Sequence, residues 1–539
     1  MAHRSNIFES IPIDLPKRSG FDLSFENLLT QKCGTLVPLL VEELLPNDTI
    51  SLGYFSQVEL PPLATNFFGR VDYCLEAFFV PMRLCWGGWK YFWTMPIYDP
   101  FEDNIYRPTA LPSLTYTSSA ALDPAGPSSL ADYLGVKRVL YKGGAVTRSI
   151  PNALPFIAYH RIYDDHYRNR DLHKPLFHNP NNYSSVPSAS EYLQTCPFVT
   201  LCSATDTVPS SFSASALFGD GSSIFDLHQR QWAKDYYTTA ALYPQAAQSS
   251  VEVKTPEGQE AGTFTIAQLR NANSLQRLAD RNNLAGFDYP NQIYSQYGVT
   301  PPDSLIDKPV FLGHSSFSIY SKGVAQTSSS MSGDSGKNPF NGIQGNKAGS
   351  GNGFGEDSLI DNFHTKEHGY LFVIGSIVPH AYYSTGNRRY LYRSVQGDFA
   401  IPLLQGLGEQ PIYSTELSGD SFSKVEVFGY QQQYSEYKYH DDEVHGILRD
   451  GESLQYYALQ RSFNPDSAFL DASFVEIPTD YLDQVFAVTT ESSGFSAWCD
   501  FFFEFKKVST LSEYVIPTLG DLKNTYKGHV DYRGSELRG

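Results

Sequence analysis

Cysteine, tryptophan and methionine are scarce in this chain of 539 residues, which has six cysteines, five tryptophans and four methionines. The cysteines are scattered and no two stand in a C-x-x-C pair, so the sequence does not indicate a disulfide framework. We expect buried free thiols in a protein that folds in a reducing cytosol. These thiols are Cys33, Cys74, Cys85, Cys196, Cys202 and Cys499.

Long apolar runs and an excess of positive charge are also lacking. No segment approaches the roughly 20 apolar residues that a membrane helix needs, and the polar N-terminal stretch does not resemble a signal peptide. We therefore predict no membrane insertion. The chain has 40 basic and 58 acidic residues, a formal charge of −18. This charge excludes a globally basic nucleic-acid-binding protein but leaves room for a local basic patch.

Aromatic and turn-forming residues are abundant instead. Aromatic residues make up 14% of the chain, with 36 tyrosines and 36 phenylalanines, beside 41 glycines and 33 prolines. Strand-forming residues outnumber long helical tracts, and the glycine and proline content implies many turns. The composition predicts a mainly β protein with a large core and long loops.

One stretch, from Gly69 to Trp93, organises the sequence. Between positions 71 and 79 every second residue is apolar, the period-2 pattern of a strand with one face on a core. The strand should stop at Pro81, because proline has no N–H to donate. Trp86, Trp89 and Trp93 follow at spacings of three and four, which predicts a short helix or turn that anchors the core or an interface.

This stretch resembles the major capsid protein of the Microviridae, small icosahedral single-stranded DNA phages, and most closely that of the gokushoviruses. In that family a strand ending in FFVP precedes a tryptophan-bearing turn. Further blocks occur here in the family's order: NALPF with a tyrosine-rich helix, a basic and aromatic segment ending in Pro-Gln, YGVTPPD before a PVFLG strand, and FGYQ before EYKY. The long insertion that usually follows the Pro-Gln is reduced here to residues 246–262.

The resemblance implies a fold and an organisation for the chain. The expected fold is an eight-stranded antiparallel jelly-roll β-sandwich with long loop insertions and a few short helices. The expected parts are an extended N-terminal arm (1–35), one capsid domain (36–508) with large insertions (about 95–150, 180–262 and 327–357), and a C-terminal tail (509–539). The insertion at 327–357 is also predicted as a flexible loop by its Gly/Ser/Asn composition.

By the same resemblance, the chain is a structural protein that assembles with itself into a T = 1 icosahedral shell around a circular single-stranded DNA genome. The expected partners are that DNA, a small basic DNA-binding protein, a pilot or spike component and a host surface receptor. The protein would be made in the host bacterial cytoplasm and reside in the virion.

An acidic shell around DNA needs local positive charge facing the genome. Candidates, chosen by their place in the terminal segments, are Lys17, Arg18, Lys523, Lys527 and Arg533. The alternative is that these residues are solvated surface charges.

No catalytic pattern is present, and we predict that the chain is not an enzyme. No serine stands in G-x-S-x-G. His364 and His368 fit H-x-x-E-H, but Gly369 and the β-type run after it break the helix that a zinc site would need. The acidic turns at 160–166 and 440–445 are candidate Ca²⁺ ligands, or solvated loops. We assign no cofactor.

A second class of function is a bacterial β-sandwich carbohydrate-binding module or hydrolase. It would present exposed tryptophans in a concave cluster together with paired carboxylates. Three of the five tryptophans lie instead in one anchor beside a core strand, which disfavours this alternative.

Overall fold

The structure is a computed structural model that describes the strands of a large sheet and many of their connections. The described residues are 18–86, 111–118, 126–137, 146–173, 222–244, 289–299, 308–325, 347–419, 426–465, 468–487 and 494–511, with short pieces that include 11–16, 89–93, 97–99, 104–106, 212–213, 525–530 and 536–537.

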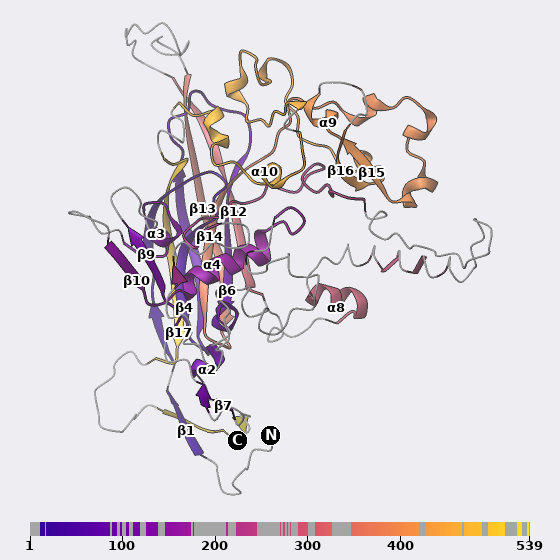
Figure 1. Ribbon diagram of the computed structural model, residues 1–539. Coiled ribbons are helices and arrows are strands. Elements are labelled where there is room, and N and C mark those ends of the chain that lie inside the picture. The colour runs from indigo at the N-terminus through magenta and orange to yellow at the C-terminus, as the bar shows by residue number, and fades with distance from the viewer. Residues whose placement is uncertain are drawn as a thin grey trace.

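A large antiparallel sheet forms the body of the molecule (Figure 1). Eight strands follow one another in the order β2-β17-β5-β13-β12-β6-β14-β4, and β3 also pairs with β17. The prediction of a mainly β, eight-stranded antiparallel fold with few short helices is confirmed. The strands are β2 (Ser19–Asp22), β3 (Phe25–Gln31), β4 (Val37–Leu44), β5 (Thr49–Glu59), β6 (Val71–Pro81), β12 (Val310–Ala325), β13 (Lys347–His364), β14 (Gly369–Pro379) and β17 (Ala497–Ser509).

The sheet curls until its two ends face each other across the core. Tyr73 of β6 lies 5.3 Å from Phe501 of β17 between ring centroids, although three strands separate β6 from β17 in the sheet. Gln31 of β3 donates a hydrogen bond to the carbonyl of Gly375 in β14, 3.0 Å away. The two layers of the sandwich are therefore two limbs of one curled sheet, and their inner faces share a single apolar core.

Strands β17 and β13 fit this curl in different ways. Strand β17 alternates buried and exposed residues along its length, with Phe501, Phe503 and Phe505 on the inner face. Strand β13 is glycine-rich because its inner face is crowded: a Cβ on Gly355 would lie 2.3 Å from the ring of Phe317. Composition predicts a loop at 327–357, but residues 347–357 belong to this strand, and 327–346 lie outside the described residues.

Strands β6 and β14 are buried on both faces. The odd positions of β6 from Val71 to Phe79 point into the main core, as the alternation predicts. The expectation of only one packed face is wrong, because Phe78 and Val80 pack into a second cluster on the opposite side. This outer cluster lies over β6, β14 and β4, and the insertions that follow β6 supply its other members.

Helix α4 (Leu154–Ile162) is the main element of this outer layer and crosses in front of the sheet (Figure 1). It continues as one π-helical turn, Tyr163–Tyr167. The other elements of the insertions are α1 (Met82–Cys85), α2 (Trp89–Trp93), β7 (Ile97–Asp99), β8 (Asn104–Tyr106), β9 (Leu114–Ser118), α3 (Leu130–Tyr133), β10 (Val146–Ile150), β11 (Phe212–Ser213) and α8 (Tyr289–Tyr297).

A third apolar cluster lies beyond one end of the sheet, where residues 381–475 form short elements (Figure 1). We call this part the distal module. It contains β15 (Glu409–Tyr413), α9 (Thr415–Ser418), β16 (Val427–Gln432) and α10 (Ala472–Val475), with 3-10 turns that include Arg389–Tyr392 and Pro402–Leu407. Tyr236 and Tyr237, from the segment before the Pro-Gln, pack into the same cluster.

The two terminal segments meet at the opposite end of the molecule (Figure 1). Strand β1 (Ile11–Pro16) pairs with β18 (Thr525–Val530), which also pairs with β19 (Glu536–Leu537). The predicted N-terminal arm is extended through β1, β2 and β3, and the last two of these join the main sheet through β17. Among the helices that the structure describes, none has the length and apolar character needed to cross a bilayer.

Candidate functional site

The three predicted anchor tryptophans lie close together but in different environments. Trp86 directly follows α1 and is 1% exposed within the outer cluster. Trp89 of α2 packs against that cluster, and its ring lies 5.8 Å from the ring of Trp93. Trp93 is 59% exposed and stacks on His368 at 4.6 Å. The anchor therefore runs from the core to the surface.

The best-defined polar group of the described residues is a largely buried ion pair on the outer face of β6, whose side chains are 19% (Arg230) and 13% (Glu76) exposed. Arg230 donates two hydrogen bonds to Glu76, at 2.9 and 3.0 Å, and a third to the hydroxyl of Ser376. The hydroxyl of Tyr167 also donates to Glu76. Because Arg230 belongs to the 222–244 segment and Tyr167 to the end of the helix that α4 begins, this network fastens both segments to the sheet.

Sequence reasoning missed this ion pair. Neither Glu76 nor Arg230 was singled out among the candidate residues. The signal that could have revealed the pair was the basic and aromatic HQRQW block at 228–232, since an arginine among buried aromatic residues needs a carboxylate partner.

Acid is expected to weaken the fold through Glu76. Burial opposes ionisation of this carboxyl, but hydrogen bonds from His314 and Arg230 and the charge of Arg230 outweigh burial and lower its pKa to about 2. A carboxyl with a depressed folded-state pKa stabilises the fold above its ordinary pKa, near 4.5, and this contribution is lost as the pH falls toward 2. Urea unfolding between pH 6 and pH 2.5 should therefore show a smaller pH dependence in Glu76→Gln than in the unchanged chain, and equal slopes would contradict the assignment.

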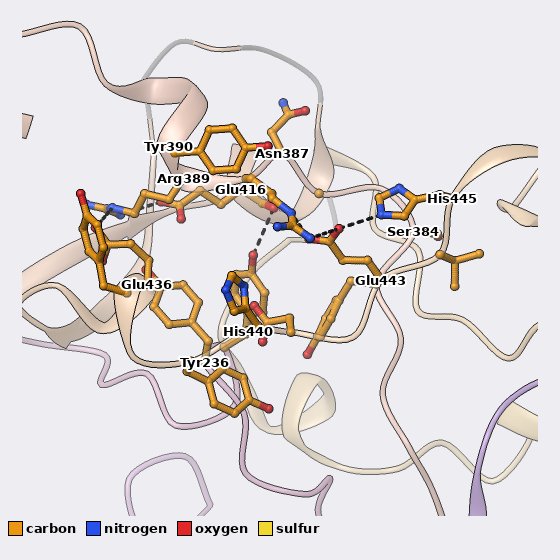
Figure 2. A pocket seen from close by; sticks show the side chains of 18 of the residues that line it. Tyr236, Ser384, Asn387, Arg389, Tyr390, Glu416, Glu436, His440, Glu443 and His445 are labelled. Atoms are coloured by element: carbon orange, nitrogen blue, oxygen red, sulfur yellow. Dashed lines mark hydrogen bonds and ion pairs between the residues drawn. The ribbon is translucent and has the colours of Figure 1, made fainter. Parts of the chain in front are cut away.

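A pocket of about 300 Å³ opens in the distal module between residues 383–393 and 434–449 (Figure 2). Arginine and carboxylate side chains line it in pairs: Arg389 donates to Glu416 at 2.7 Å, and Arg388 binds both carboxylate oxygens of Glu443. Burial and the nearby Asp235 raise the pKa of Asp441 in its wall to about 7. These ion pairs hold the short turns around the pocket together.

The histidine motifs do not form metal sites in the described part of the chain, where no group of three or more His, Cys, Asp or Glu side chains converges. His364 ends β13 and contacts the hydroxyl of Thr49, whereas His368 stacks on Trp93, so the two are not on one helix. The buried His160 contacts His228 at 2.8 Å between ring nitrogens. In the 440–445 turn, Glu443 binds Arg388 and His445.

The structure describes two of the five candidate DNA-facing residues. Arg18 is exposed, and its guanidinium donates to the hydroxyl of Thr49 and the carbonyl of Val508. Lys527 lies in β18 opposite Asp14 of β1. Lys17, Lys523 and Arg533 lie outside the described residues.

Four cysteines of the described region, Cys33, Cys74, Cys85 and Cys499, are buried free thiols, as predicted. Cys196 and Cys202 lie outside that region. Burial raises the pKa of the Cys74 thiol to about 11, so this thiol is protonated and unreactive at neutral pH.

Comparison with known proteins decides the family. Residues 10–519 match the phage capsid protein (F protein) family. The chain belongs to this family. Capsid protein VP1 of Bdellovibrio phage phiMH2K is 25% identical over 548 residues, which cover 96% of this chain and 98% of that protein. Capsid protein VP1 of Chlamydia phage 1 is 24% identical over 610 residues, covering 95% and 98%.

The match to Capsid protein VP1 of Spiroplasma virus 4 is shorter, 26% identity over 198 residues, 36% of this chain and 34% of the relative. The F-type family and these gokushovirus-like relatives confirm the resemblance to the Microviridae capsid proteins. The chain is a capsid protein of a single-stranded DNA phage and not an enzyme. The carbohydrate-binding or hydrolase alternative is therefore wrong.

Proposed function

We propose that this chain assembles with itself into a T = 1 icosahedral shell that encloses a circular single-stranded DNA genome. The observation that carries the proposal is the match of residues 10–519 to the F-type capsid family, over the full curled sheet and its insertions. Supporting it, the described chain forms its own apolar cores, so its exposed surfaces can bind other copies without exposing those cores.

Sedimentation of the expressed chain, together with the other virion components, tests self-assembly. We expect one fast-sedimenting species of uniform size. A chain that stays a slow-sedimenting monomer under these conditions would contradict the proposal.

The genome contact is proposed for the terminal segments. Strands β1 and β18 pair at one end of the molecule, and two of the five candidates, Arg18 and Lys527, lie in or next to the described parts of these segments. Positive charge from Lys17, Arg18, Lys523, Lys527 and Arg533 would offset phosphate repulsion in an otherwise acidic shell.

Replacing these five residues by glutamine is expected to reduce nuclease-protected DNA per particle. Binding of single-stranded DNA should also depend less on salt. The slope of the logarithm of the binding constant against the logarithm of the salt concentration should fall in magnitude by about 0.7 for each phosphate that is no longer neutralised. A matched control replaces Lys366 and Lys438, which are exposed and lie outside the terminal segments. Unchanged DNA content in the five-residue variant would remove these residues as candidates.

We also propose that the shell carries a small basic DNA-binding protein and a pilot or spike component, and that surface loops bind a host receptor. The relation to the gokushovirus-like phages supports these partners. The short connection at 246–262 favours other insertions as the source of surface protrusions.

A further inference from the structure

One face of the main sheet is rich in exposed aromatic side chains. On the outer side of β17, β5 and β13, Phe55 is 50% exposed, Phe354 58%, Trp498 44% and Phe502 45%. We call these four residues the aromatic face. The outer cluster covers the other limb of the sheet. On this limb the described residues leave the four side chains half exposed, although the 127–135 segment lines a pocket beside Trp498 and Asp500. A contiguous exposed apolar patch of this kind marks an interaction site.

The strand register places these side chains side by side. Phe502 of β17 is paired with Phe55 of β5, and Phe354 of β13 is paired with Gln57, two positions along the same face of β5. Trp498 is paired with Glu59, at the end of that row. Directly paired residues on one face lie within about 5.5 Å at their Cβ atoms, as Phe502 and Phe55 do, and diagonal neighbours such as Phe354 and Phe55 lie about 7–8 Å apart. Trp498 lies on the same face, beyond Asp500 and Gln57.

Carboxylates stand between and around these aromatic groups. Glu59 and Asp500 lie on the same face of β5 and β17, and the register adds Glu26 beside Phe502 and Glu356 beside Phe55. The ammonium group of Lys506, further along β17, already binds Glu504. The face therefore offers apolar surface together with a strong negative field, which excludes a phosphate backbone as its ligand and favours a cationic one.

A complementary surface adjoins the aromatic face on the same side of the sheet, where β12 runs past the start of β6. There Tyr320 is paired with Asn352 of β13, which is itself paired with Glu59. Phe68 is 64% exposed and Tyr320 is 68% exposed. A basic residue follows each of them two positions later. Arg70 follows Phe68; its side chain is 58% exposed and forms an ion pair with Asp72 at 2.8 Å. Lys322 follows Tyr320 and is exposed. We call these four residues the basic edge. It pairs aromatic groups with positive charge, as the aromatic face pairs aromatic groups with negative charge.

We propose that the aromatic face is an interface on which the basic edge of a second copy of this chain docks. The inference rests on the proposed function, because in a shell of identical chains each interface joins two patches of one sequence. Charge complementarity selects these two patches: like charges across an interface are strongly unfavourable, whereas opposite charges fix partner and register. The aromatic side chains would supply the buried apolar area.

A charge exchange in the full-length chain tests the docking. Asp500→Lys and Lys322→Glu are made separately and together, and particle yield is measured by sedimentation and electron microscopy. Each single reversal is expected to lower the yield by at least about tenfold, the effect of 1.4 kcal/mol per interface. The combination restores opposite charges between copies, so its yield should return close to that of the unchanged chain.

Glu452→Lys is the matched control, since Glu452 is exposed in the distal module and belongs to neither patch. If a reversal unfolds the chain, as judged by circular dichroism, Asp500→Asn and Lys322→Gln replace it, with smaller losses expected. Normal yield in both single variants would overturn the inference while leaving shell assembly intact. If the single variants lower the particle yield and the double variant does not restore it, the basic edge of a second copy is not what binds the aromatic face, and another cationic partner is indicated. Failure of the unchanged chain to assemble would instead overturn the proposed function.

Discussion

Replacement of Arg230 by methionine is expected to lower the free energy of unfolding by about 3 kcal/mol, the lower end of the cost of breaking a buried ion pair, because Glu76 keeps some contact with water. Glu76 would keep its burial but lose two of its hydrogen bonds, and the hydroxyl of Ser376 would lose a donor. The urea midpoint of the unassembled chain measures this loss.

The control for this prediction removes both charges. In the double variant Glu76→Gln, Arg230→Met no uncompensated charge is buried, so it should be more stable than Arg230→Met alone. If the free energy of unfolding of Arg230→Met lies within about 1 kcal/mol of that of the unchanged chain, the pair does not fasten the 222–244 segment to the sheet. Losses that small are ordinary for point substitutions.

The second large effect is expected at the tryptophan anchor. Trp86→Ala should cost about 3–5 kcal/mol, because it removes the side chain from a packed cluster and leaves a cavity. Trp93→Ala should change the free energy of unfolding by no more than about 0.5–1 kcal/mol, since more than half of that side chain is already in water.

The same two variants separate a core role from an interface role. If Trp93 contacts a neighbouring copy, Trp93→Ala should lower particle yield while its urea midpoint stays normal. If Trp86→Ala and Trp93→Ala lower the free energy of unfolding equally, the two side chains do not have different environments. If Trp93→Ala forms particles in normal yield, the anchor has a core role and no interface role.

Strands with a strong periodic pattern could be predicted from the sequence. The alternation from 71 to 79 and the stop at Pro81 correspond to β6. The β-type run that begins at Gly369 corresponds to β14, which is buried on both faces. The alternating aromatic residues near the end of the chain belong to β17 (Ala497–Ser509). In these segments the local pattern and the tertiary environment favour the same structure.

The glycine-rich half of β13 could not be recognised from its composition, because glycine and serine are typical of loops. Its glycines nevertheless occur at every second position from 349 to 355, which is a strand period. The reason is tertiary: a Cβ on Gly351 would lie 2.6 Å from Leu60, and one on Gly355 would meet Phe317. Such a close approach cannot be read from a single segment.

The partners of the polar side chains could not be predicted from the sequence, although the HQRQW block could point to Arg230 as an arginine that needs a carboxylate. Arg230 and Glu76 are 154 residues apart, and the pairs of the distal module, such as Arg389 with Glu416, depend on turns that carry no regular period. Long-range pairs follow from the topology of the curled sheet and not from spacing along the chain. The aromatic face likewise emerges only when β17, β5 and β13 are placed in register.

Electron microscopy of particles formed by this chain with the other virion components, combined with nuclease treatment of the same sample, tests its role most directly. We expect uniform isometric shells whose single-stranded DNA survives the nuclease. A chain that remains monomeric, or shells whose DNA is degraded as fast as free DNA, would contradict a genome-enclosing capsid.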